Sequence, residues 1–113
     1  MTKLVICNVA VPGFHRWEEA FKEVDYLRNV HRHVFEIEAG FQVTKNNREI
    51  EIIDTQNKIT KYLFLKYGAV CSMECDFDTM SCEDIAEDIL KQFNAYYVKV
   101  TEDGFGGSTI INN

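Results

Sequence analysis

The sequence predicts an α+β domain in which an antiparallel sheet carries two helices on one face. Two patterns lead to this fold class. Residues 31–44 alternate with a period of two, with apolar side chains at every second position from 35 to 43, which is the period of a strand with one buried face. Residues 82–93 instead repeat their apolar side chains at helical spacing. The remaining segments complete the order strand, strand, strand, helix, helix, strand, strand.

The first half of the chain is expected to be mostly strand. Residues 3–11 form an apolar run, and Pro12-Gly13 is expected to end it. Apolar residues then recur at helical spacing and suggest a short helix, at Trp17, Phe21, Val24 and Leu27. After the strand at 31–44, the asparagines of 45–47 predict a hairpin turn, because asparagine tolerates a left-handed backbone. Residues 48–54 are expected to return as an antiparallel strand.

The second half contains the clearest helix. A first helix is expected from about Thr55 to residues 67–68. For the second, Ser81 is placed to cap residues 82–93, and Glu83 and Asp84 lie in the first turn, where the helix dipole favours negative charge. Residues 96–102 then predict a strand, 104–107 a flexible turn and 108–112 a last short strand. The helix-free face of so small a sheet also needs cover, and a second copy of the chain is the expected cover.

Composition limits what the protein can do. A chain of 113 residues with 46% hydrophobic side chains predicts one folded domain, residues 1–113. The net charge of −6 argues against nonspecific binding to nucleic acid or to an anionic membrane, since both need a positive field. Without a membrane-spanning run or a signal peptide, a soluble, cytoplasmic protein is expected. The four cysteines form no CxxC pair, so we expect buried or half-buried thiols without disulfides.

The three histidines predict a metal site. His31 and His33 are alternate residues of one strand and therefore point to the same side. Two imidazoles side by side suit a divalent metal ion, and His15, near the end of a neighbouring strand, could supply a third ligand. Three neutral imidazoles and one open position are the arrangement of catalytic Zn²⁺. The alternative is that His31 and His33 are ordinary, partly buried and hydrogen-bonded strand residues.

Other polar residues could bind a ligand. Glu102 follows an apolar strand face, where a carboxylate can accept two N–H bonds from a pterin or guanine edge; the alternative is a solvated carboxylate at a strand end. Arg28 and Arg32, with Arg16, lie near the histidines and could bind a phosphate or carboxylate group. Alternatively, these arginines balance nearby acidic residues on a solvated surface.

Four segments carry a family resemblance. FHRW around His15, VHRHVFEIE with His31 and His33, SCEDIAEDIL, and VKVTEDG with Glu102 occur in the same order as in the 6-pyruvoyl-/6-carboxy-tetrahydropterin synthase family, over nearly the whole chain. The resemblance implies the tunnelling fold, which has two strands, two helices and two strands per unit. Its subunits close into a barrel with active sites at their interfaces. The resemblance also implies catalytic zinc on the three histidines and a pterin ring anchored by Glu102.

The chain also departs from this family. Leu27 occupies the position of the family's catalytic cysteine, and no histidine remains for its Asp-His acid-base pair, although Asp76, Asp78 and the cysteines of 71–75 lie in the corresponding segment. One expectation is therefore a zinc-dependent lyase or synthase acting on a pterin- or purine-like molecule, with a substitute base from 71–78. The alternative is a non-catalytic binder that sequesters a purine nucleotide or related signalling molecule. A third possibility is a structural oligomer in which zinc only stabilises the fold. Under each of these interpretations a homo-oligomer (dimer, trimer or hexamer) is expected.

Overall fold

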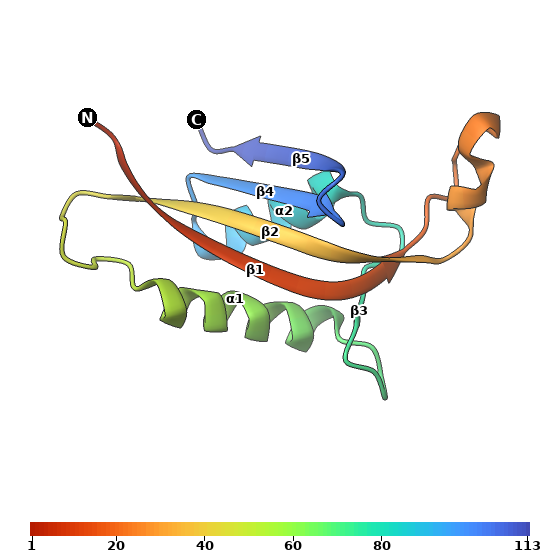
Figure 1. The fold of residues 1–113 in the computed structure, drawn as a ribbon, viewed down its shortest axis with the longest axis horizontal. Helices are drawn as coiled ribbons and strands as arrows, with labels where there is room; N and C mark the ends of the chain where they lie inside the picture. The colour runs from red at the N-terminus through yellow and green to blue at the C-terminus, as the bar shows by residue number, and fades with distance from the viewer.

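A computed structural model describes all residues from 1 to 113. It is an α+β domain built on one five-stranded sheet with the strand order β3-β1-β2-β4-β5 (Figure 1). The elements, in chain order, are β1 (Lys3–His15), a 3₁₀ helix η1 (Lys22–Arg28), β2 (His31–Val43), α1 (Ile52–Tyr67), β3 (Cys75–Asp76), α2 (Cys82–Phe93), β4 (Tyr97–Glu102) and β5 (Gly106–Ile111). Neither α-helix combines the length and hydropathy that crossing a bilayer requires.

Both α-helices cover the same face of the sheet, as the sequence predicts. The alternating apolar residues of β1, β2 and β4 form one core with the apolar stripes of α1 and α2. Its fully buried side chains include Val11 and Phe35 from the sheet, Leu63 from α1 and Ile89 from α2. The predicted capping of α2 is confirmed, because Ser81 and Asp84 form a reciprocal capping box.

The first strand is longer than predicted, because Pro12-Gly13 does not end it. β1 pairs with β2 without interruption from Lys3 to His15. The carbonyl of Phe14 accepts a hydrogen bond from the N–H of Phe77, on the edge of β1 that faces away from β2. Pro12 lies two residues before Phe14, and alternate residues of a strand direct their backbone groups to the same edge. The nitrogen of Pro12 faces that same outer side, so its missing N–H removes no bond to β2. This extra length carries His15 to the end of the sheet.

The predicted strand at 48–54 is wrong. Glu49 folds residues 44–49 into a closed loop, because its carboxylate accepts the backbone N–H groups of Thr44 and Lys45, each at 3.1 Å. Glu51 then caps α1 by accepting from Asp54 N at 2.7 Å, so the helix begins at Ile52 rather than near Thr55.

Smaller differences concern the sheet and the thiols. The sheet is mixed rather than purely antiparallel, because the two-residue β3 runs parallel to β1. β5 begins at Gly106, so the turn after β4 is shorter than predicted. All four cysteines are free, as expected, and three are buried, but Cys71 is exposed.

The apolar stripe predicted to form a helix after β1 forms only η1, which buries none of its residues. Residues 16–30, which we call the arm, project from the end of the sheet where β1 passes to β2 (Figure 1). Trp17, Phe21 and Tyr26 of the arm remain exposed in the single chain.

Candidate metal centre

Four side chains meet where β1, β2 and β4 come together at one end of the sheet. His15 is the last residue of β1 and lies opposite His31, while His33 lies two residues further along β2. Glu102, the last residue of β4, lies opposite Phe35. Because alternate strand residues share a face, all four side chains continue the helix-covered face beyond its last apolar layer. The three predicted metal ligands are therefore brought together, with Glu102 beside them.

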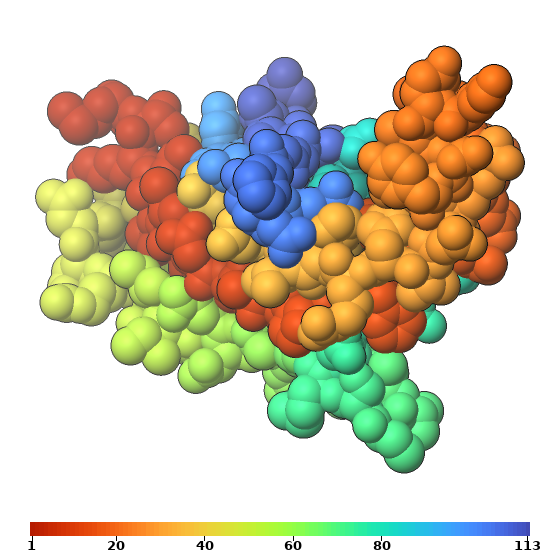
Figure 2. Space-filling model, turned by 45° about the vertical axis from the view of Figure 1, so that its right-hand side comes forward, coloured from red at the N-terminus to blue at the C-terminus, as the bar shows by residue number.

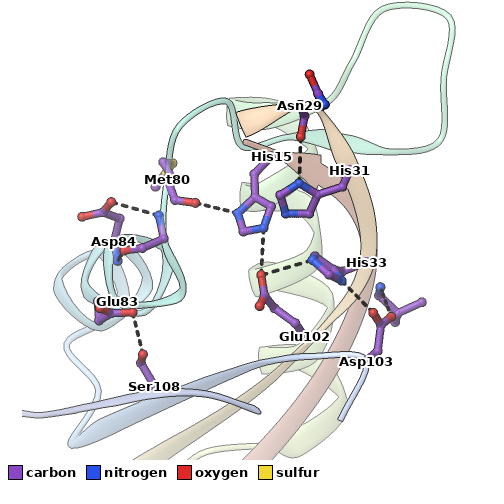
Figure 3. Close-up of polar contacts among 12 residues, drawn as sticks. His15, Asn29, His31, His33, Met80, Glu83, Asp84, Glu102, Asp103 and Ser108 are labelled. Atoms are coloured by element: carbon purple, nitrogen blue, oxygen red, sulfur yellow. Dashed lines mark hydrogen bonds and ion pairs between the residues drawn. The ribbon is translucent and has the colours of Figure 1, made fainter. Parts of the chain in front are cut away.

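The four donor groups converge closely. The ring centroids of His15 and His31 are 4.6 Å apart, those of His31 and His33 5.0 Å, and those of His15 and His33 5.3 Å. Oε2 of Glu102 lies 2.8 Å from Nε2 of His15 and 3.3 Å from Nε2 of His33 (Figure 3). One ligand atom from each of the four residues lies within 4.8 Å of each of the others. Such a group can hold one metal ion.

Each imidazole is oriented by a hydrogen bond at its other nitrogen. Nδ1 of His15 donates to the carbonyl of Met80 at 2.8 Å, and Nδ1 of His31 donates to the carbonyl of Asn29 at 2.9 Å. Nδ1 of His33 donates to Oδ2 of Asp103 at 2.7 Å. Since these oxygens can only accept, each Nδ1 carries a proton and each Nε2 is left for the cluster. Metal-bound histidines in proteins are oriented in this way.

The three orienting oxygens come from different parts of the chain. Met80 lies in the segment leading into α2, where its N–H donates to Phe77 at 2.8 Å, and Asn29 caps the end of η1. Asp103 is bound to Val34 of β2 in both directions, donating its N–H to the carbonyl at 2.9 Å and accepting the N–H on Oδ1 at 2.8 Å. No simple motif marked these partners in the sequence, although Asp103 lies next to Glu102.

The charges at the site fit a cation. His15 is 8% exposed, and its Nε2 is buried without a partner in hydrogen-bond geometry. Burial alone would lower the pKa of His15, but the Glu102 carboxylate and the Met80 carbonyl outweigh it and raise that pKa. The His15 contact in turn lowers the pKa of Glu102 despite its partial burial. Imidazole and carboxylate ligands suit several divalent transition metals, Zn²⁺ among them.

A cavity of about 560 Å³ opens beside the cluster, between the arm, the start of α2 and the β4–β5 end. In Figure 2 the arm (orange) stands beside β4 and β5 (blue), with the region around residue 80 (cyan) visible between them. Leu27 and Cys82 both line this cavity. Burial, together with the negative charges of Glu102 and Glu83, raises the pKa of Cys82 to about 12, so this thiol stays protonated and is a poor nucleophile.

The other predicted site residues lie outside this cavity. Arg28 donates Nε to the carbonyl of Ala20 at 2.8 Å, and Arg32 points to the opposite face of β2, where it pairs with Glu74. Among the three arginines considered, only Arg16 lines the cavity. Within one chain, residues 71–78 contribute no lining side chain either. Ligand binding by Arg28 and Arg32 stays a prediction.

Comparison with protein-family models and with curated proteins found no match to this chain. The chemical interpretation of the site therefore depends on its geometry and on the residues themselves.

Proposed function

We propose that this chain is a zinc protein of the 6-pyruvoyl-/6-carboxy-tetrahydropterin synthase type, which binds a pterin- or purine-like molecule in the cavity beside the metal. One observation carries the proposal. The Nε2 atoms of His15, His31 and His33 face a common point while each Nδ1 is held by an oxygen. Metal-bound histidines in proteins are oriented in this way, whereas hydrogen-bonded strand histidines need not share a common orientation.

The fold and the cavity are consistent with this proposal. Two strands, two helices and two strands follow each other along the chain, apart from the short η1 and β3, and the resemblance implies this order. A volume of about 560 Å³ is within the range of small-molecule sites, about 300–1,000 Å³. Assembly into a tunnelling-fold oligomer would place further residues at this cavity, because the exposed arm lies at its rim.

Each residue has a defined task in the proposed reaction site. The three imidazoles hold the metal, and their oxygen partners keep them aligned. Zinc, when bound, polarises oxygen atoms of the ligand as a Lewis acid. Glu102 reaches the cavity from the end of β4 and can accept N–H bonds from a flat heterocycle.

A second candidate function is supported by the lining of the cavity. Leu27 lines it at the position where the family has its catalytic cysteine, and the only thiol there, Cys82, stays protonated. All three histidines of the chain are in the metal cluster, so none is left for proton transfer. These observations favour a non-catalytic binder that sequesters a purine nucleotide or related signalling molecule.

Two measurements test the proposal. Elemental analysis of tag-free protein, purified without chelator, is expected to find about one zinc per chain. His31→Ala should lose this zinc, and Cys71→Ser, which alters an exposed thiol outside the cluster, should retain it. Metal-free wild-type protein that is well folded would refute the proposal.

The second measurement separates the enzyme from the binder. Neopterin and guanosine are incubated with the zinc-loaded protein and recovered by denaturation. Mass spectrometry that finds a bound probe unchanged supports the binder, and a product formed in proportion to enzyme and time supports the enzyme. If neither probe binds, the proposed ligand class is wrong.

A further inference from the structure

We infer that Glu102 is a fourth ligand of the metal, so that the resting site is closed to external ligands. The inference rests on the proposed metal binding by His15, His31 and His33 and adds a regulatory property to it. A catalytic zinc site normally keeps one position open, whereas four protein ligands close it. In this chain the Glu102 carboxylate, which lines the ligand cavity, would occupy the fourth coordination position of the metal.

The separations between donor atoms support this assignment. In a tetrahedral zinc site, bonds of about 2.0–2.2 Å place neighbouring ligand atoms about 3.3–3.6 Å apart. Oε2 of Glu102 is 3.3 Å from Nε2 of His33 and 2.8 Å from Nε2 of His15. All four donor atoms lie within 4.8 Å of each other, so small movements of the side chains suffice to reach this geometry.

The distribution of protons gives a second, independent reason. Because each Nδ1 proton points to an oxygen, a neutral imidazole presents its Nε2 lone pair toward Glu102. Two lone pairs at 2.8 Å repel each other unless a proton or a metal ion lies between them. Nε2 of His15 has no partner in hydrogen-bond geometry, so a metal ion between this nitrogen and Oε2 of Glu102 would satisfy both atoms better than a shared proton.

No arginine or lysine compensates the charge of Glu102. Its ion pairs run only to His15 and His33. Arg16, which also lines the cavity, is paired with Glu18 at 3.1 Å and Asp78 at 3.5 Å. A partly buried carboxylate without a cation is costly, and a metal ion shared with the imidazoles removes this cost.

The position of Glu102 also allows its carboxylate to leave the metal. Its backbone is held at the end of β4, where its carbonyl accepts from Phe105 at 3.0 Å, but its side chain remains 32% exposed. Rotation of the side chain can therefore carry the carboxylate from the cluster into the cavity without moving the strand. Any ligand that reaches the metal must first displace Glu102, and a ring whose N–H groups bind that carboxylate would assist the displacement.

Cobalt substitution tests this inference without any enzymatic assay. Co²⁺ is added to metal-free wild-type protein and to Glu102→Gln, and azide is titrated while the visible spectrum is recorded. Glu102→Ala serves as a second variant, and Glu83→Gln as the control, because it removes a negative charge from the same cavity outside the four-residue cluster. We expect both Glu102 variants to bind azide at least 10-fold more tightly than wild type and Glu83→Gln. Loss of an outer-shell partner weakens metal affinity by about 10–100-fold, and loss of a direct ligand should weaken the Co²⁺ affinity of both Glu102 variants by at least as much.

The outcomes distinguish the inference from the proposed function. If wild type binds one Co²⁺ per chain but responds to azide as the Glu102 variants do, Glu102 is not a ligand and the three-histidine site stands. The same conclusion follows if Glu102→Gln and Glu102→Ala keep the Co²⁺ affinity of wild type. If wild type binds no Co²⁺, or His31→Ala binds it equally well, both the metal site and the inference are wrong.

Discussion

Replacing Asp103 by asparagine should weaken metal binding while leaving the fold intact. The Asp103 carboxylate accepts from Nδ1 of His33 at 2.7 Å and from the N–H of Val34 at 2.8 Å. Asparagine has one acceptor oxygen, so one of these donors loses its partner, and the negative charge behind His33 disappears. Loss of such an outer-shell carboxylate weakens metal affinity by about 10–100-fold, or about 1.4–2.7 kcal/mol. Asparagine also tolerates the left-handed backbone of Asp103, at φ 55°, so no strain is added.

A competition titration of Zn²⁺ against a chromogenic chelator measures this effect. Asp78→Asn is the matched control, because Asp78 is also left-handed, at φ 49°, but its carboxylate pairs with Arg16 rather than with a histidine. We expect the control to bind zinc within about twofold of wild type, well under the 10-fold loss expected at Asp103. An Asp103→Asn protein with wild-type zinc affinity and an unchanged circular dichroism spectrum would refute the role assigned to this carboxylate.

Three further predictions concern the scaffold. Burial alone would raise the pKa of the Asp88 carboxyl, but hydrogen bonds lower it, from Tyr67, Tyr62 and Lys66. Asp88→Asn should therefore lower the free energy of unfolding at pH 7 by about 1.5–3 kcal/mol, measured by urea unfolding. Because the pKa of Asp88 is lower in the folded than in the unfolded state, the difference in stability between wild type and variant should shrink as the pH falls below about 4. A difference that stays constant with pH would contradict this interpretation. Ser81→Ala should lower stability by about 0.5–2 kcal/mol in thermal unfolding through loss of the α2 cap, whereas Ser72→Ala, on an exposed loop, should change it little. In the native protein a thiol-specific disulfide reagent should label Cys71 rapidly, and Cys71→Ser should abolish that fast phase; fast labelling of a buried cysteine would show that the core opens readily.

The elements predicted correctly are those with a strong local signal. Strict alternation along 31–44 specifies both the strand and the common face of His31 and His33. The stripe and cap of α2 are equally local, since Ser81 and Asp84 are three residues apart. The three candidate histidine ligands could therefore be named from the sequence, because two of them share one strand.

The wrong predictions concern segments in which the local pattern is ambiguous. The isoleucines near residue 50 fit a strand as well as the start of a helix, and the capping contact of Glu51 decides for the helix. Pro12-Gly13 usually ends a strand. Here the backbone nitrogen of Pro12 faces away from β2, so its missing N–H removes no bond between the two strands. In both places a specific hydrogen-bonding arrangement outweighs the average preference of the residues.

The amino-acid sequence alone predicts the α+β class and a metal site on three histidines, since both predictions depend on residues near each other in sequence. The position of Glu102 depends instead on the pairing of β4 with β2 across 67 residues of chain, from Phe35 to Glu102. The carbonyls of Met80 and Asn29 carry no side-chain signal at all, because every residue has a carbonyl and only the fold aims these two at the imidazoles. Tertiary structure therefore decides which ring nitrogen of each histidine is available to a metal ion and which carboxylate lies beside the three imidazoles.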